Sequence, residues 1–491
     1  MISQATRDKY TTTIGIECHV QLKTKTKLFS AVGNDAREAP PNTLVNHIDF
    51  GLPGALPVLN EEALHLATRA AFALGTEPER FSKFDRKHYF YPDLPKGYQI
   101  SQYDEPIIGK GEITIDVNGE PKVIGITRAH LEEDAGKSTH AAGKDYSLVD
   151  LNRAGTPLLE IVSEPDMHTS AEAKAYAREL YLRMKYADVS EANLYYGNMR
   201  FDVNVSVSQT DELGTRSETK NLNSFRSVEK AVEYEVTRQI ELLEKGEKVV
   251  QETRGWDDAK QKTLSQRSKE NADDYRYMPD PDIPPVVLTD EYIAKIGEEI
   301  AVMPQEWRER LESLGLDKAS VETLIDAGAD NKSYLKRIVD ASKVSKDFAK
   351  FVANSTINID IPFEKSLEEE QVKISSDVRI GIYKELYELY GRGELSSNSI
   401  TTLIQEFLSA DSAPTDVQQY ATDKGYIQVS DEGEIAKIVV QVLADNPKAA
   451  EDVKNGEMKA VGFLVGQVMK LSKGKANPSL AQDLIKKQLD I

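Results

Sequence analysis

The chain has 491 residues, of which 40% are hydrophobic and 29% charged, and its formal net charge is −20 at pH 7. Because one domain usually has roughly 100–200 residues, this length predicts several domains. The acidic balance excludes a protein that binds nucleic acid through an overall positive charge. Any RNA binding would have to depend on local basic patches, on shape or on a partner.

The sequence also disfavours a membrane protein and a protein stabilised by disulfides. No run of about 18 apolar residues occurs, and the N-terminal segment lacks the apolar stretch of a secretory signal. The single cysteine, Cys18, excludes an internal disulfide and a multi-cysteine zinc site. We therefore expect a cytoplasmic protein that has no membrane-bound part.

From residue 13 to about 290 the sequence is rich in strand patterns. Strands are predicted at 14–22, 112–117, 123–131, 158–162 and 200–208, and helices at 61–74, 170–186 and 227–244. Because these strands and helices do not alternate regularly, the pattern predicts an α+β domain. A proline cluster at 278–285 then interrupts the chain, and we place the first domain boundary near residue 293.

The rest of the chain is predicted to be helical. Helices are expected at 306–314, 320–327, 332–341, 346–353, 375–392 and 399–409, with a loop at 360–370. Small residues at 410–415 indicate a linker, which leaves a third helical unit. The predicted domains are therefore 1–293, 294–410 and 411–491.

The predicted strand at 14–22 carries polar side chains on one face only. Strict alternation places Glu17, His19 and Gln21 together on that face and Cys18 on the other. A carboxylate beside an imidazole can bind a divalent metal ion, although a solvated edge strand gives the same pattern more often. Since Cys18 and His19 point apart, they cannot form a nucleophile–base pair.

A similar polar row follows the strand at 200–208. Arg200, Asp202, Asn204 and Ser206 share one face, opposite an apolar row. Hydrogen-bond donors beside a carboxylate are typical of a site for phosphate and metal. A row of polar side chains that merely faces solvent explains this strand equally well.

The segment at 128–139 contains three consecutive acids, 132–134, before Gly136 and Lys137. Acids supply the oxygen ligands that magnesium prefers, and Lys137 could bind phosphate; an acidic turn is the alternative. The segment is not a P-loop, because Leu131 stands where the first glycine would have to be. Together the motifs indicate a metal-dependent phosphoryl-transfer or ligand-binding domain, without a recognisable hydrolase nucleophile.

Five longer strings extend from the first domain almost to the C-terminus and resemble one known family. They are residues 84–102, 150–165, 220–225, 274–279 and 462–467. These strings are similar to the signatures of the B subunits of tRNA-dependent amidotransferases. Strings of this length and spread are specific to a family in a way that short motifs are not.

The resemblance implies a role in a heterotrimer. In that family, the A subunit releases ammonia from glutamine, and the small C subunit wraps the other two. The B subunit uses ATP to phosphorylate the side-chain carboxylate of Glu-tRNA(Gln) or Asp-tRNA(Asn), and ammonia then displaces the phosphate. Two alternatives remain: a scaffold that only binds tRNA, and an ATP-dependent carboxylate–amine ligase that acts without tRNA.

The resemblance also assigns residues. The family's metal ligands match Glu17, His19, Glu133 and Asp202, which are therefore expected to hold Mg²⁺ and to be catalytic. Lys87 matches a catalytic lysine at the mouth of the ammonia channel; a surface salt bridge is its alternative role. Three basic residues are assigned to the phosphates of ATP or to the 3′ end of tRNA, namely Lys137, Arg153 and Arg200.

In the family the three domains are a β-rich cradle, a helical domain and a tail related to a small helical tRNA-binding module. Residues 450–491 contain seven lysines and five acids, in contrast to the acidic remainder. This contrast indicates a basic patch for tRNA, with ordinary solubilising lysines as the alternative.

The sequence departs from the family at several positions. Many members bind zinc through four cysteines, which here are Ser30, Val32, Asn46 and Asp49, so no zinc is expected. Further departures are His88, where asparagine is common, and Tyr195 and Tyr196, which stand where acidic residues are frequent. An acidic role is therefore not expected at 195–196.

Overall fold

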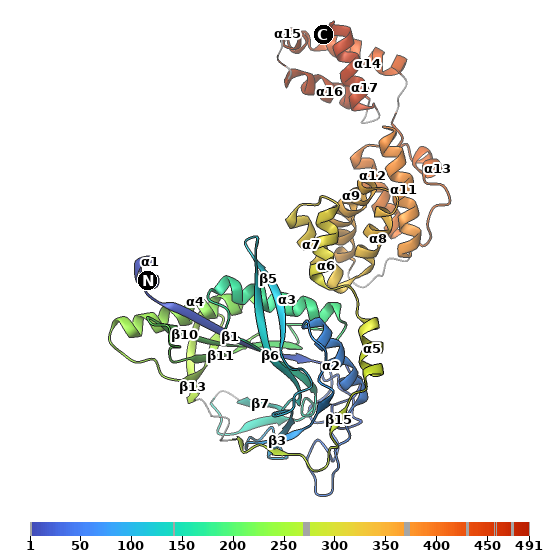
Figure 1. The fold of residues 1–491 in the computed structure, drawn as a ribbon. Coiled ribbons are helices and arrows are strands. Elements are labelled where there is room, and N and C mark those ends of the chain that lie inside the picture. Colours follow the sequence, from blue (N-terminus) through green and yellow to red (C-terminus); the bar gives the residue numbers. More distant parts are fainter. Residues whose placement is uncertain are drawn as a thin grey trace. The chain divides into compact units, whose positions relative to one another are not determined.

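The computed structural model describes residues 2–140, 143–268, 275–367, 374–428, 432–455, 457, 459–472 and 476–490. The chain forms two compact units, Met1–Glu306 and Trp307–Ile491 (Figure 1). In the described part, no helix is both long enough and apolar enough to cross a membrane.

An 11-stranded sheet organises the first unit, in the order β13-β12-β11-β10-β1-β9-β6-β4-β3-β14, with β5 paired to β6. Its pairs are antiparallel except β11 with β12. The bounds are β1 Thr11–Gln21, β3 Asp85–His88, β4 Tyr98–Ser101, β5 Gly111–Val117, β6 Glu120–Glu133, β9 Pro157–Ser163, β10 Met199–Ser208, β11 Ser217–Leu222, β12 Glu252–Asp257, β13 Lys262–Ser268 and β14 Met278–Pro279. Two short ladders join β2 (Phe81–Ser82) to β15 (Val286–Val287) and β7 (Lys137–His140) to β8 (Ser147–Asp150).

Helices α3 (Ser170–Tyr186) and α4 (Phe225–Glu244) lie beside each other along one face of this sheet (Figure 1). Each begins at a hydroxyl cap: the side chain of Thr169 accepts from the Glu172 amide, and that of Ser224 from the Ser227 amide. The unit also contains α1 (Gln4–Arg7), α2 (Glu61–Ala73) and α5 (Asp290–Glu299).

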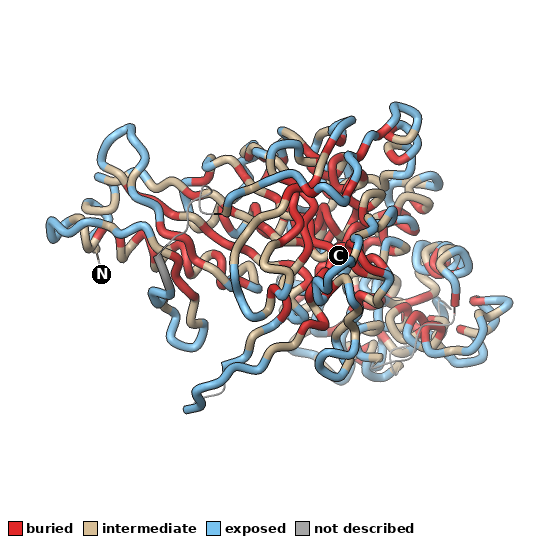
Figure 2. Tube along the Cα trace, turned by 90° about the horizontal axis from the view of Figure 1, so that it is seen from below, coloured by how far each residue is buried: buried red, intermediate tan, exposed pale blue. Residues whose placement is uncertain are grey.

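The core of the first unit lies between the helices and the sheet. It includes the apolar face of β1 and residues of α3 and α4, namely Ile14, Ile16, Cys18, Val20, Tyr176, Leu180, Val228 and Val232. Buried stretches follow the strands and exposed stretches the connecting loops (Figure 2). Each such apolar side chain contributes about 1.5–3 kcal/mol when buried, so this face of β1 is fixed toward the helices. The opposite face is thereby left for Glu17 and His19.

The second unit is helical. Its elements, with α6 beginning just before the boundary, are α6 Pro304–Ser313, α7 Lys318–Asp330, α8 Ser333–Ser342, α9 Lys346–Ser355, the π-helix Thr356–Asp360, α10 Ile361–Ser366, α11 Ser376–Gly391, α12 Ser397–Ser409, α13 Val417–Asp423, α14 Glu432–Asp445, α15 Pro447–Lys454, α16 Lys459–Leu471 and α17 Pro478–Leu489. The helices α14 to α17 enclose an apolar cluster of their own, which includes Val439, Leu464 and Ile485.

The structure confirms the α+β class and the β-rich first region followed by helices. The predicted strands and helices are present with ends shifted by a few residues. The expected loop at 360–370 was wrong for 361–366, which form α10, because Pro362 near its first turn is compatible with a helix start. Residues 368–370, and residue 274 of the string 274–279, lie outside the described residues.

The division into domains at 293 and 410 stays a proposal. Helix α5 spans residue 293. Helix α13 packs against α12: the rings of Tyr420 and Phe407 lie 5.2 Å apart, and Tyr420 donates to Glu406 at 2.9 Å. We therefore place the start of the tail's own core at α14.

Candidate functional site

The polar face of the sheet gathers charged side chains from several strands. On β1, Glu17 lies opposite Asp202 of β10, and His19 lies opposite Glu160 of β9. Residues two apart on a strand share a face, so the alternation of β1 fixes Glu17 and His19 on this side. The pairing register then determines which acids they meet.

A first group of possible metal ligands consists of His19, Glu132 and Glu160. The Nε2 atom of His19 lies 3.7 Å from Glu132 Oε1 and 3.5 Å from Glu160 Oε2. Burial lowers the pKa of His19, but the hydrogen bond and charge of Glu160 outweigh this and raise it to about 9. His130 adds a second imidazole, with its Nε2 at 3.5 Å from Glu160 Oε2.

A second group consists of Glu17, Asp202 and Glu218, the last from β11. Burial raises the pKa of Glu17, and the carboxylate of Glu160 raises it further. The ammonium of Lys220 lies 2.6 Å from Asp202 Oδ2 and 3.3 Å from Glu218 Oε1. Although burial opposes ionisation of Asp202, the charge of Lys220 lowers its pKa.

Both groups fit a hard divalent cation. Within each group the candidate ligand atoms lie within 4.8 Å of one another. Carboxylate oxygens with at most one imidazole are the ligands that magnesium and manganese prefer. Carboxylates this close also repel one another, so a bound cation would relieve an electrostatic cost.

The four residues expected to hold Mg²⁺ do not form one group. Glu17, His19 and Asp202 lie on the polar face, whereas Glu133 belongs to neither group. The Oε1 atom of Glu133 accepts from the Lys96 ammonium and, at 2.9 Å, from the Ile100 amide. Consecutive strand residues face opposite sides, and in this structure Glu132 is the residue that lies near His19.

Sequence reasoning missed Glu132, Glu160 and Glu218. Alternation carried a signal for the first, because Ala129 and Leu131 are core residues and imply that Glu132 faces the other way. Glu160 was visible as the one charge in an otherwise apolar strand at 157–163. Glu218 becomes apparent only with the register, which places it opposite Asn204.

Lys87 of β3 is held near the first group. Burial disfavours its charge, but the carboxylates of Glu132 and Glu160 outweigh this and raise its pKa. Its Nζ atom also lies 4.9 Å from the centre of the Tyr275 ring. The negative charge of these carboxylates therefore favours the ammonium form of Lys87.

A cavity of about 360 Å³ adjoins the end of β1 at Gln21. Two of the three predicted phosphate-binding residues, Lys137 and Arg153, line it. Arg153 Nε and Nη2 donate to the carbonyls of Ala135 and Gly136 at 3.0 and 2.6 Å. The third, Arg200, is not among the lining residues; its Nη2 binds Asp134 Oδ2 at 3.0 Å, and Arg153 Nε lies 3.3 Å from the same oxygen.

Comparison with known proteins shows the family of the chain. The GatB/GatE catalytic domain matches residues 12–294, and a second GatB domain matches residues 333–489. The chain is 43% identical to the B subunit of the aspartyl/glutamyl-tRNA(Asn/Gln) amidotransferase of Carboxydothermus hydrogenoformans, over 98% of this chain and 99% of the relative.

Relatives with the same description occur in distant bacteria. The Bdellovibrio bacteriovorus protein is 43% identical over 98% of this chain and 99% of its own length. The Persephonella marina protein is 44% identical over 97% and 98%. Because the match covers both units at this identity, the chain belongs to the GatB family, the B subunits of aspartyl/glutamyl-tRNA amidotransferases.

Proposed function

We propose that this chain is the B subunit of a tRNA-dependent amidotransferase, a ligase that forms carbon–nitrogen bonds. Its substrates are Glu-tRNA(Gln), Asp-tRNA(Asn) or both, together with ATP and ammonia. The observation that carries the proposal is the convergence of two carboxylate groups on one sheet face, beside a cavity lined by Lys137 and Arg153. Family membership supports the same reaction class.

The reaction has two steps. A side-chain carboxylate oxygen of the aminoacyl group attacks the γ-phosphorus of ATP, the bond to ADP breaks, and an acyl phosphate forms. Ammonia then attacks the carbonyl carbon, loses a proton and expels inorganic phosphate. That phosphate retains one oxygen of the original carboxylate. Phosphorylation is needed because a carboxylate is a poor electrophile, and it requires two anions to meet.

The residues of the sheet fit that requirement. Mg²⁺ would be held by Glu17, Asp202 and Glu218 and by His19, Glu132 and Glu160, and it would neutralise phosphate charge. Glu133 stays a candidate ligand from the sequence comparison, although its carboxylate binds Lys96. Lys137 and Arg153 would bind the phosphates as fixed cations, and Arg200 would support Arg153 through Asp134.

Lys87 would act as a charge near the point where ammonia enters. Its ammonium form, which the carboxylates of Glu132 and Glu160 favour, can stabilise the anionic acyl phosphate. The partners in this proposal are the A subunit, which supplies ammonia, and the C subunit, which completes a heterotrimer.

The test is amide formation by the complex with the A and C subunits. We expect amidation of Glu-tRNA(Gln) or Asp-tRNA(Asn) to require ATP and Mg²⁺, and ammonium chloride to replace glutamine. Amidation of free glutamate or aspartate at the same rate would instead identify a ligase that acts without tRNA. Full activity of the complex after Asp202→Asn would overturn the assignment of Asp202 as a metal ligand.

A further inference from the structure

Two exposed aromatic side chains stand at the cavity beside β1. Tyr195 is 85% exposed and Tyr196 is 54% exposed, and Tyr196 lines the cavity. Their rings contact each other edge to face, with centroids 5.2 Å apart and planes at 78°. The Arg37 guanidinium lies over the Tyr196 ring, so the ring of Tyr195 and the remaining surface of Tyr196 are available for a planar ligand.

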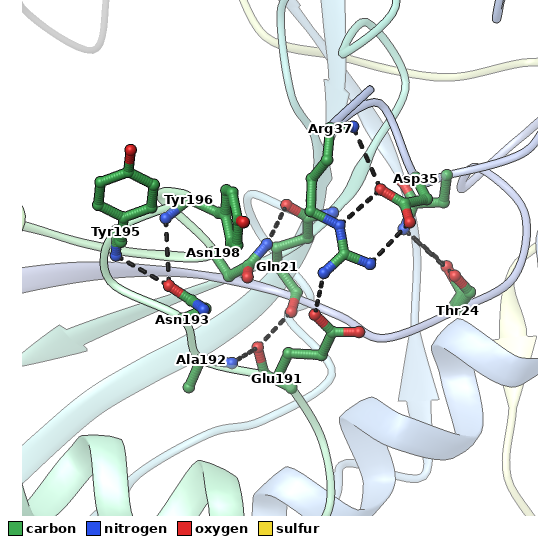
Figure 3. Close-up of polar contacts among 12 residues, drawn as sticks. Gln21, Thr24, Asp35, Arg37, Glu191, Ala192, Asn193, Tyr195, Tyr196 and Asn198 are labelled. Atoms are coloured by element: carbon green, nitrogen blue, oxygen red, sulfur yellow. Dashed lines mark hydrogen bonds and ion pairs between the residues drawn. The ribbon is translucent and has the colours of Figure 1, made fainter. Parts of the chain in front are cut away.

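The loop that presents these tyrosines is fixed by its own hydrogen bonds (Figure 3). The side-chain oxygen of Asn193 accepts from the amides of Tyr195 at 3.0 Å and Tyr196 at 3.2 Å. The Asn198 side chain then donates to Gln21 Oε1 at 3.0 Å, which ties the loop to β1. Because these hydrogen bonds hold the backbone of the loop, only the side-chain torsions of the two tyrosines have to be ordered when a ligand stacks on their rings.

The cavity also presents cations. The Arg37 guanidinium carbon lies 5.6 Å from the centre of the Tyr196 ring, and Arg37 is held by Asp35 and by Glu191 at 2.9 Å (Figure 3). Among the described residues, Lys137 has no ion-pair partner, and its side chain is exposed. A lysine without a partner beside open aromatic faces offers the two contacts that a nucleotide needs, for its phosphate and for its base.

We propose that this cavity and the 193–198 loop bind a nucleotide. The base stacks on Tyr195 and Tyr196, and the phosphate lies toward Lys137 and Arg153. The direction follows from the phosphate side: Arg153 and Arg200 share Asp134, and Arg200 lies opposite His19 in the pairing of β10 with β1. A nucleotide in this cavity would therefore extend its phosphate side toward the metal-binding groups.

This inference rests on the proposed function, which supplies two sources of a nucleotide. One is ATP, and the other is the single-stranded 3′ end of the aminoacylated tRNA. Stacking on tyrosine tolerates any base, so the chemistry is the same for both. The experiment must therefore separate them.

The test uses the complete complex and measures kcat and KM separately for ATP and for mischarged tRNA. Tyr195→Ala and Tyr196→Ala should each raise the KM of one of the two substrates about tenfold, because one stacking contact is lost. At saturation kcat should stay close to wild type. Tyr195→Phe and Tyr196→Phe should behave as wild type, because phenylalanine keeps the ring face. The substrate whose KM rises identifies the nucleotide.

The matched control is Phe81→Ala, which removes an aromatic ring of 47% exposure from β2 and should change neither KM. Unchanged KM values in both alanine variants would overturn the inference. So would a phenylalanine variant as defective as its alanine counterpart, or loss of the A or the C protein of the complex on purification, which would assign the loop to a protein interface. Failure of the proposed function itself would differ, since the wild-type complex would then show no ATP-dependent amidation.

Discussion

Buried charges occur in both units of the molecule, but they are arranged in different ways. In the second unit, Arg337 and Asp360 are 2% and 0% exposed at the side chain and lie 2.7 Å apart. The Tyr383 hydroxyl donates to the other oxygen of Asp360, so this carboxylate is satisfied on both sides. Nearby, Arg379 binds Glu364 at 2.6 Å in the same one-to-one manner.

On the polar sheet face of the first unit, acids converge instead of pairing one to one. Glu17, Asp202 and Glu218 share one nearby ammonium, that of Lys220, and Glu132 and Glu160 share His19 and His130. In a buried ion pair the two charges compensate each other, and removal of one partner is costly. Neighbouring carboxylates instead repel each other, and a bound cation would relieve this repulsion. The comparison indicates that the Arg337–Asp360 pair serves structure, whereas the converging acids of the polar sheet face suit a bound cation.

The largest expected effect is on stability in the second unit. Asp360→Asn should lower the free energy of unfolding by about 3–5 kcal/mol, because it leaves the Arg337 charge buried without a counterion. Urea unfolding measures this change. The control is Asp377→Asn, which breaks an exposed ion pair with Lys336 in the same unit and should cost less than about 1 kcal/mol. Equal losses of unfolding free energy in both variants would contradict the expected difference between the buried and the exposed ion pair.

The opposite pattern is expected at Asp202. Asp202→Asn should lower kcat for tRNA-dependent amidation about 100-fold, because a metal ligand and a counterion of Lys220 are lost. Without added metal its melting temperature should fall less than that of Asp360→Asn, because Lys220 keeps Glu218 as a partner at 3.3 Å. A strong loss of stability with unchanged kcat would make Asp202 a structural residue like Asp360.

The neighbouring residues Glu132 and Glu133 test which side of β6 carries the metal ligand. Glu132→Gln should reduce kcat by about 10- to 100-fold, because Glu132 lies in the group with His19. Glu133→Gln should act mainly on stability, since Glu133 binds Lys96 and the Ile100 amide. Kinetics and thermal melting of the two variants decide between them. A reversed outcome would return the metal-ligand role to Glu133, as the family resemblance implies.

These two residues also show how much of the site could be predicted from the sequence. Alternation alone places Glu17, His19 and Asp202 on polar faces, because one strand is enough to determine which side chains share a side. Composition does not show which of the three acids at 132–134 lies on the polar sheet face. The assignment to Glu132 follows only once Leu131 is known to be buried. Glu160 and Glu218 could not be assigned to a group, because their neighbours depend on the order and register of β9, β1, β10 and β11.

In the second unit, hydrophobic periodicity was sufficient to predict most of the helices. It could not predict that the chain continues through a π-helix at Thr356–Asp360 into α10. The buried ion pair between Arg337 and Asp360 joins α8 to this π-helix, and periodicity within a single helix cannot predict such a contact. Nor did the small-residue linker at 410–415 reveal that α13 packs back on α12.

The smallest expected effect concerns the C-terminal helices α14 to α17. Deletion of 432–491, which removes an apolar cluster that is separate from the first unit's core, should leave the metal-binding groups intact. Apparent affinity for tRNA should fall about tenfold and depend less on salt, because lysine–phosphate contacts are lost. Binding curves at two salt concentrations measure both effects, and kcat for bound tRNA should not change. Unchanged affinity and salt dependence would mean that these lysines only face solvent.

The central claim is that the acid-rich face of the first unit serves the phosphorylation of a carboxylate. It is tested most directly by tRNA charged with glutamate or aspartate that carries ¹⁸O in the side-chain carboxylate. With ATP, Mg²⁺ and ammonium chloride, the account predicts one ¹⁸O atom in the inorganic phosphate for each amide formed, measured by mass spectrometry. Release of phosphate whose fourth oxygen comes from water, at the same rate of amide formation, would contradict it.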